Sequence, residues 1–167
     1  MSENVACSVC LKPKAKLECG ICKEPICKTC AVFIEEDTLA FLNPMPEDFL
    51  TRTFCPLCFD AKVQPTIDQY SSDIEKAKDV FVFYKTENKE SRFFKRTDLV
   101  LKVKDIADRE EALLRLAYQA VKANCNTIVD VDLISEKIRK GSYQTSKWSG
   151  TAHPIDADPR VLEKRLK

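Results

Sequence analysis

The sequence predicts an α+β protein built of two parts, and three observations lead to this fold class. Four Cys-x-x-Cys pairs lie within residues 7–58, which indicates a small cysteine-rich module. Beyond residue 79, stretches rich in β-branched and aromatic residues alternate with polar segments, a pattern typical of β-strands. One amphipathic helix is predicted among these stretches, so the second part should be a mainly antiparallel sheet with one covering helix.

The composition limits the classes of function. The chain has 167 residues, of which 27 are basic and 26 acidic, and its formal net charge is +1. Such a balanced chain has no global field that attracts nucleic acid, so we expect no specific nucleic-acid binding. No run of about 18 apolar residues is present, so we expect no transmembrane helix. The start of the chain, Met1–Val5, lacks the blocks of a signal peptide, which favours a reducing cytoplasm.

The four cysteine pairs indicate metal binding. A single Cys-x-x-Cys pair is ambiguous, because it can be a redox dithiol, a disulfide or half of a metal site. Tetrahedral zinc takes four ligands, so eight cysteines in four pairs complete two structural zinc sites and leave no open position. A module of this size buries too little apolar surface to fold alone. We therefore expect zinc to supply about 10 kcal/mol or more of folding free energy per site.

The spacing of the pairs predicts how they share the two ions. The pattern is C-x2-C-x8-C-x2-C-x4-C-x2-C-x24-C-x2-C. Only four residues separate the second pair from the third, too few for a relaxed loop that closes both pairs on one ion. An interleaved arrangement is therefore predicted. The first zinc is assigned to Cys7, Cys10, Cys27 and Cys30, and the second to Cys19, Cys22, Cys55 and Cys58.

The run CGICKEPICKTC, from Cys19 to Cys30, resembles the centre of cross-brace zinc fingers, and FYVE domains most closely. The resemblance covers about the first third of the chain. FYVE domains that bind phosphatidylinositol 3-phosphate carry a basic, histidine-containing motif before the third cysteine. This chain has Lys14–Glu18 there, without histidine or arginine, and Arg52–Cys55 in place of their Arg-Val-Cys element. The resemblance thus implies the two-zinc framework without most of the phosphate-binding residues.

Three lysines remain on the loop where FYVE domains contact lipid: Lys12, Lys14 and Lys16. Each could contribute about 1 kcal/mol beside an anionic headgroup. The alternative, which we favour from sequence, is that they are simply solvated.

RING fingers are the other cross-brace family that this module resembles. Cys7–Leu11 and Cys55–Cys58 are similar to the two loops with which RING fingers grip a ubiquitin-conjugating enzyme, which implies a ubiquitin ligase. RING fingers usually have Cys-x-His at the centre and a shorter gap before the next ligand, whereas this chain has a second cysteine and a gap of four. A third hypothesis is a thiol redox protein that uses the Cys-x-x-Cys pairs directly.

The chain is predicted to divide into four segments. Residues 1–62 form the zinc module. Residues 63–78 form a linker, because the stretch from Phe59 to Ser72 contains Pro65 and has no clear period. Residues 79–156 form the α+β domain, and residues 157–167 form a short C-terminal helix and tail.

One part of the zinc module, residues 31–54, lies between the third and fourth cysteine pairs. Its apolar residues recur seven positions apart, from Val32 and Phe33 to Leu39 and Ala40, which predicts a short helix. A further turn is expected at 47–50, after two prolines. We expect these apolar residues to pack on the zinc framework or on the second domain, and a docking surface for a partner or a bilayer is the alternative.

The α+β domain is predicted in the order β-β-α-β-β. Strands are expected at 80–84, 92–103, 127–134 and 143–155, with turns at 85–89 and 140–142. The helix should begin after the N-cap Asp108, with acidic residues in its first turn, and end near Ala123, because Asn124 tolerates the left-handed conformation. Asp158 followed by proline predicts a last short helix.

The pieces ANCNTIV (residues 123–129) and GTA (residues 150–152) resemble small bacterial YbjQ-type domains, over about half of the second domain. The usual glycine at the corner of that family is absent here. Such domains have been called heavy-metal-binding and tend to form rings. The resemblance therefore implies a fold and a homo-oligomer, but it supplies no chemistry.

The sequence contains no assembled catalytic constellation. His153 is the only histidine, and Cys125, the ninth cysteine, is expected to be a buried structural thiol. Asp130 and Asp132 alternate with apolar residues, so we expect them to face solvent. We therefore predict a non-catalytic, cytoplasmic zinc-binding module that docks a protein partner or an anionic membrane surface. The C-terminal domain would be its scaffold or oligomerisation element.

Overall fold

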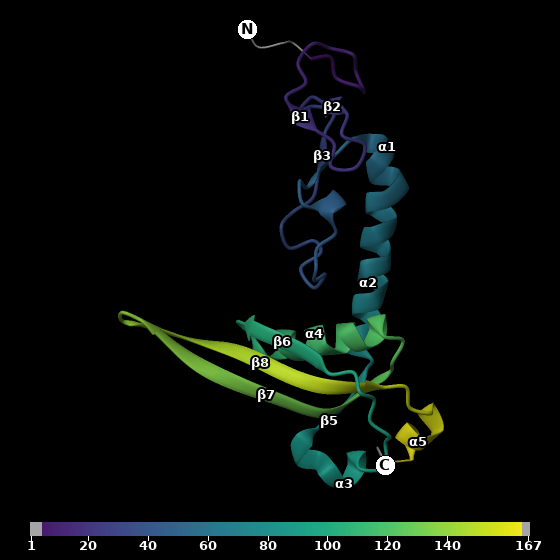
Figure 1. The fold of residues 1–167 in the computed structure, drawn as a ribbon, viewed down its shortest axis with the longest axis vertical. Coiled ribbons are helices and arrows are strands. Elements are labelled where there is room, and N and C mark those ends of the chain that lie inside the picture. The colour runs from purple at the N-terminus through teal and green to yellow at the C-terminus, as the bar shows by residue number, and fades with distance from the viewer. Residues whose placement is uncertain (1–4, 165–167) are drawn as a thin grey trace. The chain divides into compact units, whose positions relative to one another are not determined.

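The computed structural model describes residues 5–164, apart from the side chains at positions 87, 88 and 90. The chain forms two compact units that divide between Ser71 and Ser72. The first contains two clusters of cysteines, and the second contains a mixed, mostly antiparallel four-stranded sheet with packed helices (Figure 1). The predicted α+β fold class is therefore confirmed.

The first unit has very short strands, because the cysteine pairs interrupt the chain every few residues. β1 (Leu17–Glu18) pairs with β2 (Pro25–Ile26), and β3 (Val32–Phe33) pairs with β4 (Thr53–Phe54), both antiparallel. The core mixes cysteines with apolar side chains. Its buried members are Cys7, Cys19, Ile26, Cys27, Leu39, Phe49, Phe54, Cys55 and Val63.

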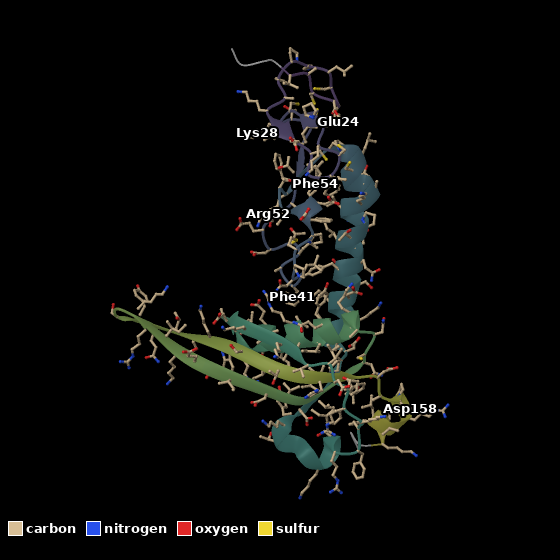
Figure 2. The ribbon with its side chains drawn as sticks, viewed as in Figure 1. Glu24, Lys28, Phe41, Arg52, Phe54 and Asp158 are labelled. Carbon is tan, nitrogen blue, oxygen red and sulfur yellow. The ribbon has the colours of Figure 1, made fainter. Side chains whose placement is uncertain are left out.

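The segment 31–54 folds differently from the prediction. The short helix expected over residues 32–40 is wrong, because Val32 and Phe33 instead form β3 and pair with β4. The turn expected near residue 47 is confirmed by the 3-10 helix η1 (Glu47–Phe49). Leu39 is buried, and the ring of Phe49 lies 5.8 Å from that of Phe54 (labelled in Figure 2), so the segment packs on the cysteine core as expected.

Residues 63–78, for which an irregular connector was expected, are helical. Helix α1 (Pro56–Cys58) continues through the π-helical turn η2 (Phe59–Val63) into α2 (Gln64–Lys78). Val63, Ile67 and Tyr70 recur at helical spacing and pack on the cysteine core. The hydroxyl of Tyr70 accepts a hydrogen bond from the backbone N–H of Phe41 at 3.1 Å.

The sheet of the second unit has the strand order β5-β7-β8-β6. β5 (Phe81–Tyr84) runs parallel to β7 (Thr127–Lys140), whereas β8 (Tyr143–Ile155) is antiparallel to both β7 and β6 (Leu101–Ile106). Helix α4 (Arg109–Lys122) packs on β6, β7 and β8. The loop expected after β5 contains a 3-10 turn, η3 (Lys85–Glu87), and a short helix, α3 (Asn88–Ser91).

The helix ends of the second unit are those that the sequence predicts. The carboxylate of Asp108 accepts a hydrogen bond from the N–H of Glu111 at 2.9 Å, and Asn124 follows α4 with a φ of +57°. α5 (Pro159–Glu163) begins after Asp158, whose carboxylate accepts the N–H of Arg160 at 2.9 Å. Residues 165–167 of the predicted tail lie outside the described residues.

The strand predicted over residues 92–103 is wrong in its first half, because β6 begins only at Leu101. Arg96 explains the loop that replaces it. Its Nη1 donates to the carbonyls of Ser91 and Phe94, each at 2.8 Å, and its Nε and Nη2 donate to the Asp130 carboxylate at 2.8 and 2.9 Å. The carbonyls of Ser91 and Phe94 converge on this one guanidinium, which holds the segment as a loop.

Asp130, which was expected to face solvent, is instead the partner of Arg96. It has a φ of +53° and lies where the pairing register of β7 with β8 shifts, between Val129 and Asp132. Such a bulge redirects a side chain out of the regular alternation. Hydrogen bonds from Arg96 hold the pKa of Asp130 below its usual value, so the pair is ionised at neutral pH.

We expect Arg96→Met to lower the free energy of unfolding by about 2 kcal/mol, because it leaves charge-assisted acceptors unpaired. Both side chains of the ion pair are largely covered, at 31% and 24% exposed. Urea unfolding of the zinc-loaded chain, followed by the fluorescence of Trp148, measures this in the second unit. The matched control is Lys85→Met, which removes an exposed ion pair to Asp132 and should cost less than about 1 kcal/mol. Equal losses in the two variants would contradict the role assigned to Arg96.

Candidate metal centre

Eight cysteine side chains converge in two groups of four. Within each group, the four sulfur atoms all lie within 4.8 Å of one another. Cys7, Cys10, Cys27 and Cys30 form zinc group 1, and Cys19, Cys22, Cys55 and Cys58 form zinc group 2. The first and third pairs along the chain therefore meet, as do the second and fourth.

The sulfur–sulfur distances fit a metal tetrahedron and not a disulfide. The Sγ atoms of Cys10 and Cys27 lie 3.8 Å apart, and those of Cys22 and Cys55 lie 3.9 Å apart. Zinc–sulfur bonds of about 2.3 Å in a regular tetrahedron place the sulfurs about 3.8 Å apart. A disulfide would require about 2.05 Å. Each group can therefore hold one zinc ion with four thiolate ligands.

The two groups are built from one local motif that occurs four times. After each pair, the backbone N–H four residues beyond the first cysteine donates to that cysteine's carbonyl. The donors are Leu11, Lys23, Ala31 and Phe59, at 2.8 to 3.0 Å. Leu11 and Lys23 have φ values of +59° and +61°, which tighten the turns after the first two pairs. These turns bring the two sulfurs of each pair to one side of the chain.

Backbone amides also join the pairs across each group. The N–H of Cys27 donates to the Sγ of Cys7, and the N–H of Cys55 donates to the Sγ of Cys19, each at 3.3 Å. The acceptors in both bonds are buried. Amide donors stabilise a thiolate more than a thiol, so this arrangement favours the ionised, metal-binding form.

The pKa values of the thiols differ sharply within each group. The hydrogen bond from the backbone N–H of Cys10, supported by that from Cys27, lowers the pKa of Cys7 to about 6, although burial opposes this. A hydrogen bond with Cys27, together with burial, raises the pKa of Cys30 to about 12. In zinc group 2, burial raises the pKa of Cys19, but hydrogen bonds from backbone amides outweigh burial and lower this pKa to about 6. Burial and a hydrogen bond with Cys55 raise the pKa of Cys58 to about 12. Four neighbouring thiolates repel one another, and a divalent cation bound between them would offset this repulsion.

Gly20 is a residue of this centre that sequence reasoning missed. It directly follows Cys19, and its N–H donates to the carbonyl of Thr53 at 2.8 Å. A Cβ added at this position would lie 2.6 Å from the carbonyl oxygen of Asp48, so only glycine allows this approach. The signal was available, because this is one of only three glycines in the chain and it lies between two ligands.

The other residues singled out from sequence lie outside both zinc groups. Lys12, Lys14 and Lys16 are exposed on the loop that follows Cys10. Cys125 is half-buried, its Sγ lies 3.5 Å from the carbonyl of Ala123, and burial raises its pKa. A ring nitrogen of His153 lies 3.3 Å from the carbonyl of Thr97. Across residues 5–164, no further group of three metal-binding side chains comes together.

The comparisons with known proteins return no relative: no family model, curated protein or solved structure matches the chain. The assignment of zinc therefore rests on the number, spacing and geometry of the cysteines. A search of the described helices for one long and apolar enough to cross a membrane finds none.

We expect native mass spectrometry of the wild-type chain to show two zinc ions. Cys27→Ser should lose at least one ion, because it removes a buried ligand whose amide also supports Cys7. Cys125→Ser is the matched control and should keep both ions, since this cysteine lies outside the two groups. Two zinc ions retained in Cys27→Ser, or one lost in Cys125→Ser, would contradict the assignment.

We also expect zinc affinity to fall as the pH is lowered. Thiols with a pKa of about 12, such as Cys30, are protonated at neutral pH and must release that proton when zinc binds. Each displaced proton weakens binding by about tenfold per pH unit of acidification. Zinc release to a chromogenic chelator between pH 8 and pH 6 measures this. A zinc affinity that stays constant over this range would show that the ligands are already ionised.

Proposed function

We propose that the protein is a non-catalytic, zinc-dependent interaction module of the FYVE-like cross-brace type, and that its first loop docks onto an anionic membrane surface. The observation that carries the proposal is the composition of residues 9–16. Val9 and Leu11 are 45% and 77% exposed, and Lys12, Lys14 and Lys16 are all exposed beside them. Apolar and basic side chains on one loop suit the boundary between lipid headgroups and acyl chains.

The loop is held in place by zinc group 1. The N–H of Cys7 donates to the carbonyl of Lys12 at 3.0 Å, and the N–H of Ala15 donates to the carbonyl of Val5 at 3.1 Å. The N–H of Lys14 adds a bond to the carbonyl of Lys12 at 2.8 Å. A loop ordered in advance loses little conformational entropy on binding. Zinc would therefore be needed to present the loop, although the ion does not touch the membrane.

The expected affinity is low for one copy of the chain. Three lysines near an anionic surface contribute about 3 kcal/mol, and burial of one leucine adds about 2 kcal/mol. A total of about 5 kcal/mol corresponds to a dissociation constant near the millimolar range. Several copies acting together would bind far more tightly. This is consistent with the C-terminal domain as a YbjQ-like scaffold or oligomerisation element, and with a peripheral position at a membrane inside the cell.

A second candidate function is supported by one further observation. Leu57, in the first turn of α1, is 81% exposed although it lies between the ligands Cys55 and Cys58. RING fingers use a side chain at this place to hold a ubiquitin-conjugating enzyme, so a RING-like ubiquitin ligase is the alternative. The spacing of the sulfurs, which fits zinc, disfavours a thiol redox protein.

Sedimentation with lipid vesicles tests the membrane proposal. The zinc-loaded full chain should bind phosphatidylcholine vesicles that contain phosphatidylserine and should not bind vesicles of phosphatidylcholine alone. Changing Lys12, Lys14 and Lys16 to Glu should weaken binding by about 100-fold or more, since each lysine supplies about 1 kcal/mol.

The charge-matched control changes Lys28, Lys62 and Lys76 to Glu, three exposed residues away from this loop. It should retain binding within a small factor. Equal losses of vesicle binding in the two variants would show that only the net charge matters, and would overturn docking by this loop. Ubiquitin transfer that is lost in Val9→Ala or Pro56→Ala, with zinc retained, would favour the ligase instead.

A further inference from the structure

The hairpin of β7 and β8 extends well beyond the rest of its sheet. The pairing of β5 with β7 ends at Val131, and the pairing of β6 with β8 ends at Trp148. Beyond the pair Ser135–Trp148, β7 and β8 continue alone to the pair Lys140–Tyr143 at the tip. Residues 135–148, here called the arm, thus form a two-stranded ribbon that projects from the domain (Figure 1).

Both faces of the arm are open to solvent. Every residue from Ser135 to Ser146 is exposed except Ile138, which is half-buried. Gly141 closes the tip in the left-handed conformation, with a φ of +63°. An isolated hairpin is only marginally stable in water, so a ribbon that buries so little is not explained by the stability of the fold.

The arm is basic, although the chain as a whole is nearly neutral. It contains four basic residues and one acidic residue, Glu136, a net charge of +3 compared with +1 for the whole chain. Lys147, at the base, lies 4.0 Å from the carboxylate of Asp105. Among the residues that the structure describes, Lys137, Arg139 and Lys140 form no ion pair. Positive charge is therefore concentrated and available toward the tip.

These charges lie on both faces of the ribbon. Residues paired directly across an antiparallel ribbon share a face, and successive residues alternate. Lys137 and Arg139 therefore lie on one face, across from Ser146 and Gln144. Lys140 lies on the other face, across from Tyr143, and that face also carries the pair of Glu136 with Lys147 nearer the base. Figure 2 shows side chains with nitrogen ends on both sides of the projecting hairpin.

We propose that the arm binds double-stranded DNA by entering its major groove, with Lys137, Arg139 and Lys140 contacting phosphates on both sides. The major groove is about 12 Å wide and admits a two-stranded β-ribbon. Contacts of this kind position a protein without reading sequence, and serine, threonine and glutamine side chains such as those of the arm also donate to phosphate. The phosphates on either side of the groove match a ribbon that carries basic residues on both faces.

Two other occupants fit the arm less well. A flat anionic membrane would contact one face of the ribbon and leave the charges of the other face in water. A second copy of the arm would bring two segments of charge +3 together, which is repulsive. The near-neutral net charge led us to expect no specific nucleic-acid binding, but net charge does not show how charge is distributed along the fold.

Fluorescence anisotropy with a labelled blunt DNA duplex of mixed sequence, and the zinc-loaded full chain, tests the proposal. We expect saturable binding that weakens steeply with salt. The variant with Lys137→Glu, Arg139→Glu and Lys140→Glu should bind at least about tenfold more weakly, and its slope of log affinity against log salt should be smaller by about 3. Replacement of residues 137–146 by Asn-Gly, which closes the ribbon at its base, should abolish the remaining binding.

The charge-matched control changes Lys89, Lys95 and Lys164 to Glu, exposed residues outside the arm, and should bind DNA like the wild type. Loss of binding in this control as well would overturn the role of the arm. Three other results would also overturn the proposal: no DNA binding by the wild type, equal binding to duplex RNA, whose major groove is too narrow for a ribbon, or arm-dependent binding to phosphatidylserine vesicles alone. Vesicle binding through Lys12, Lys14 and Lys16 would be unaffected by these arm variants.

Discussion

The crowding of four thiols at each of two points is the constraint on which the N-terminal unit depends. Hydrogen bonds from backbone amides lower the pKa of one thiol in each group to about 6. Burial and hydrogen bonds with neighbouring cysteines raise the pKa of another thiol in each group to about 12. Without a cation, the groups would retain protons that oppose tetrahedral coordination. If each group takes up a zinc ion, folding of this unit and metal binding would be one process.

The interleaved grouping extends this dependence to the rest of the unit. Zinc group 2 joins the turn at Cys19 to the start of α1 at Cys55, so the segment between them must fold back. Phe49 and Phe54 fill the space that this creates, and Gly20 approaches the backbone of Asp48 there. A metal ion in each group would hold these loops together, so few apolar side chains would suffice. Apolar residues such as Leu11 and Leu57 are then not needed in the core, and both are exposed.

The sequence was most informative where structure follows from local counting. Four ligands per zinc and a gap of four residues between the second and third pairs predicted the interleaved groups, and the caps at Asp108 and Asp158 marked their helices. Sequence reasoning missed helix α2 because its first half packs in the first unit and its second half belongs to the second unit. Val63, Ile67 and Tyr70 pack on the cysteine core, whereas Asp73 is buried and pairs with Lys122 at 3.2 Å in the second unit. A charged residue at a packed position hides the helical period.

Asp130 and the arm show what a sequence pattern omits. A single bulge at Asp130 turns a residue that alternation assigns to solvent into the anchor of Arg96, which in turn bonds the carbonyls of Ser91 and Phe94. The strand predicted to end at Ile134 likewise continues to Lys140, because a local pattern does not tell how far a ribbon extends beyond its neighbours. The role of the basic residues of the arm in binding can be inferred only once it is known that the arm projects from the sheet. Lys137, Arg139 and Lys140 are ordinary surface residues in a list, but on a ribbon open on both faces they form a site suited to a groove lined with phosphates.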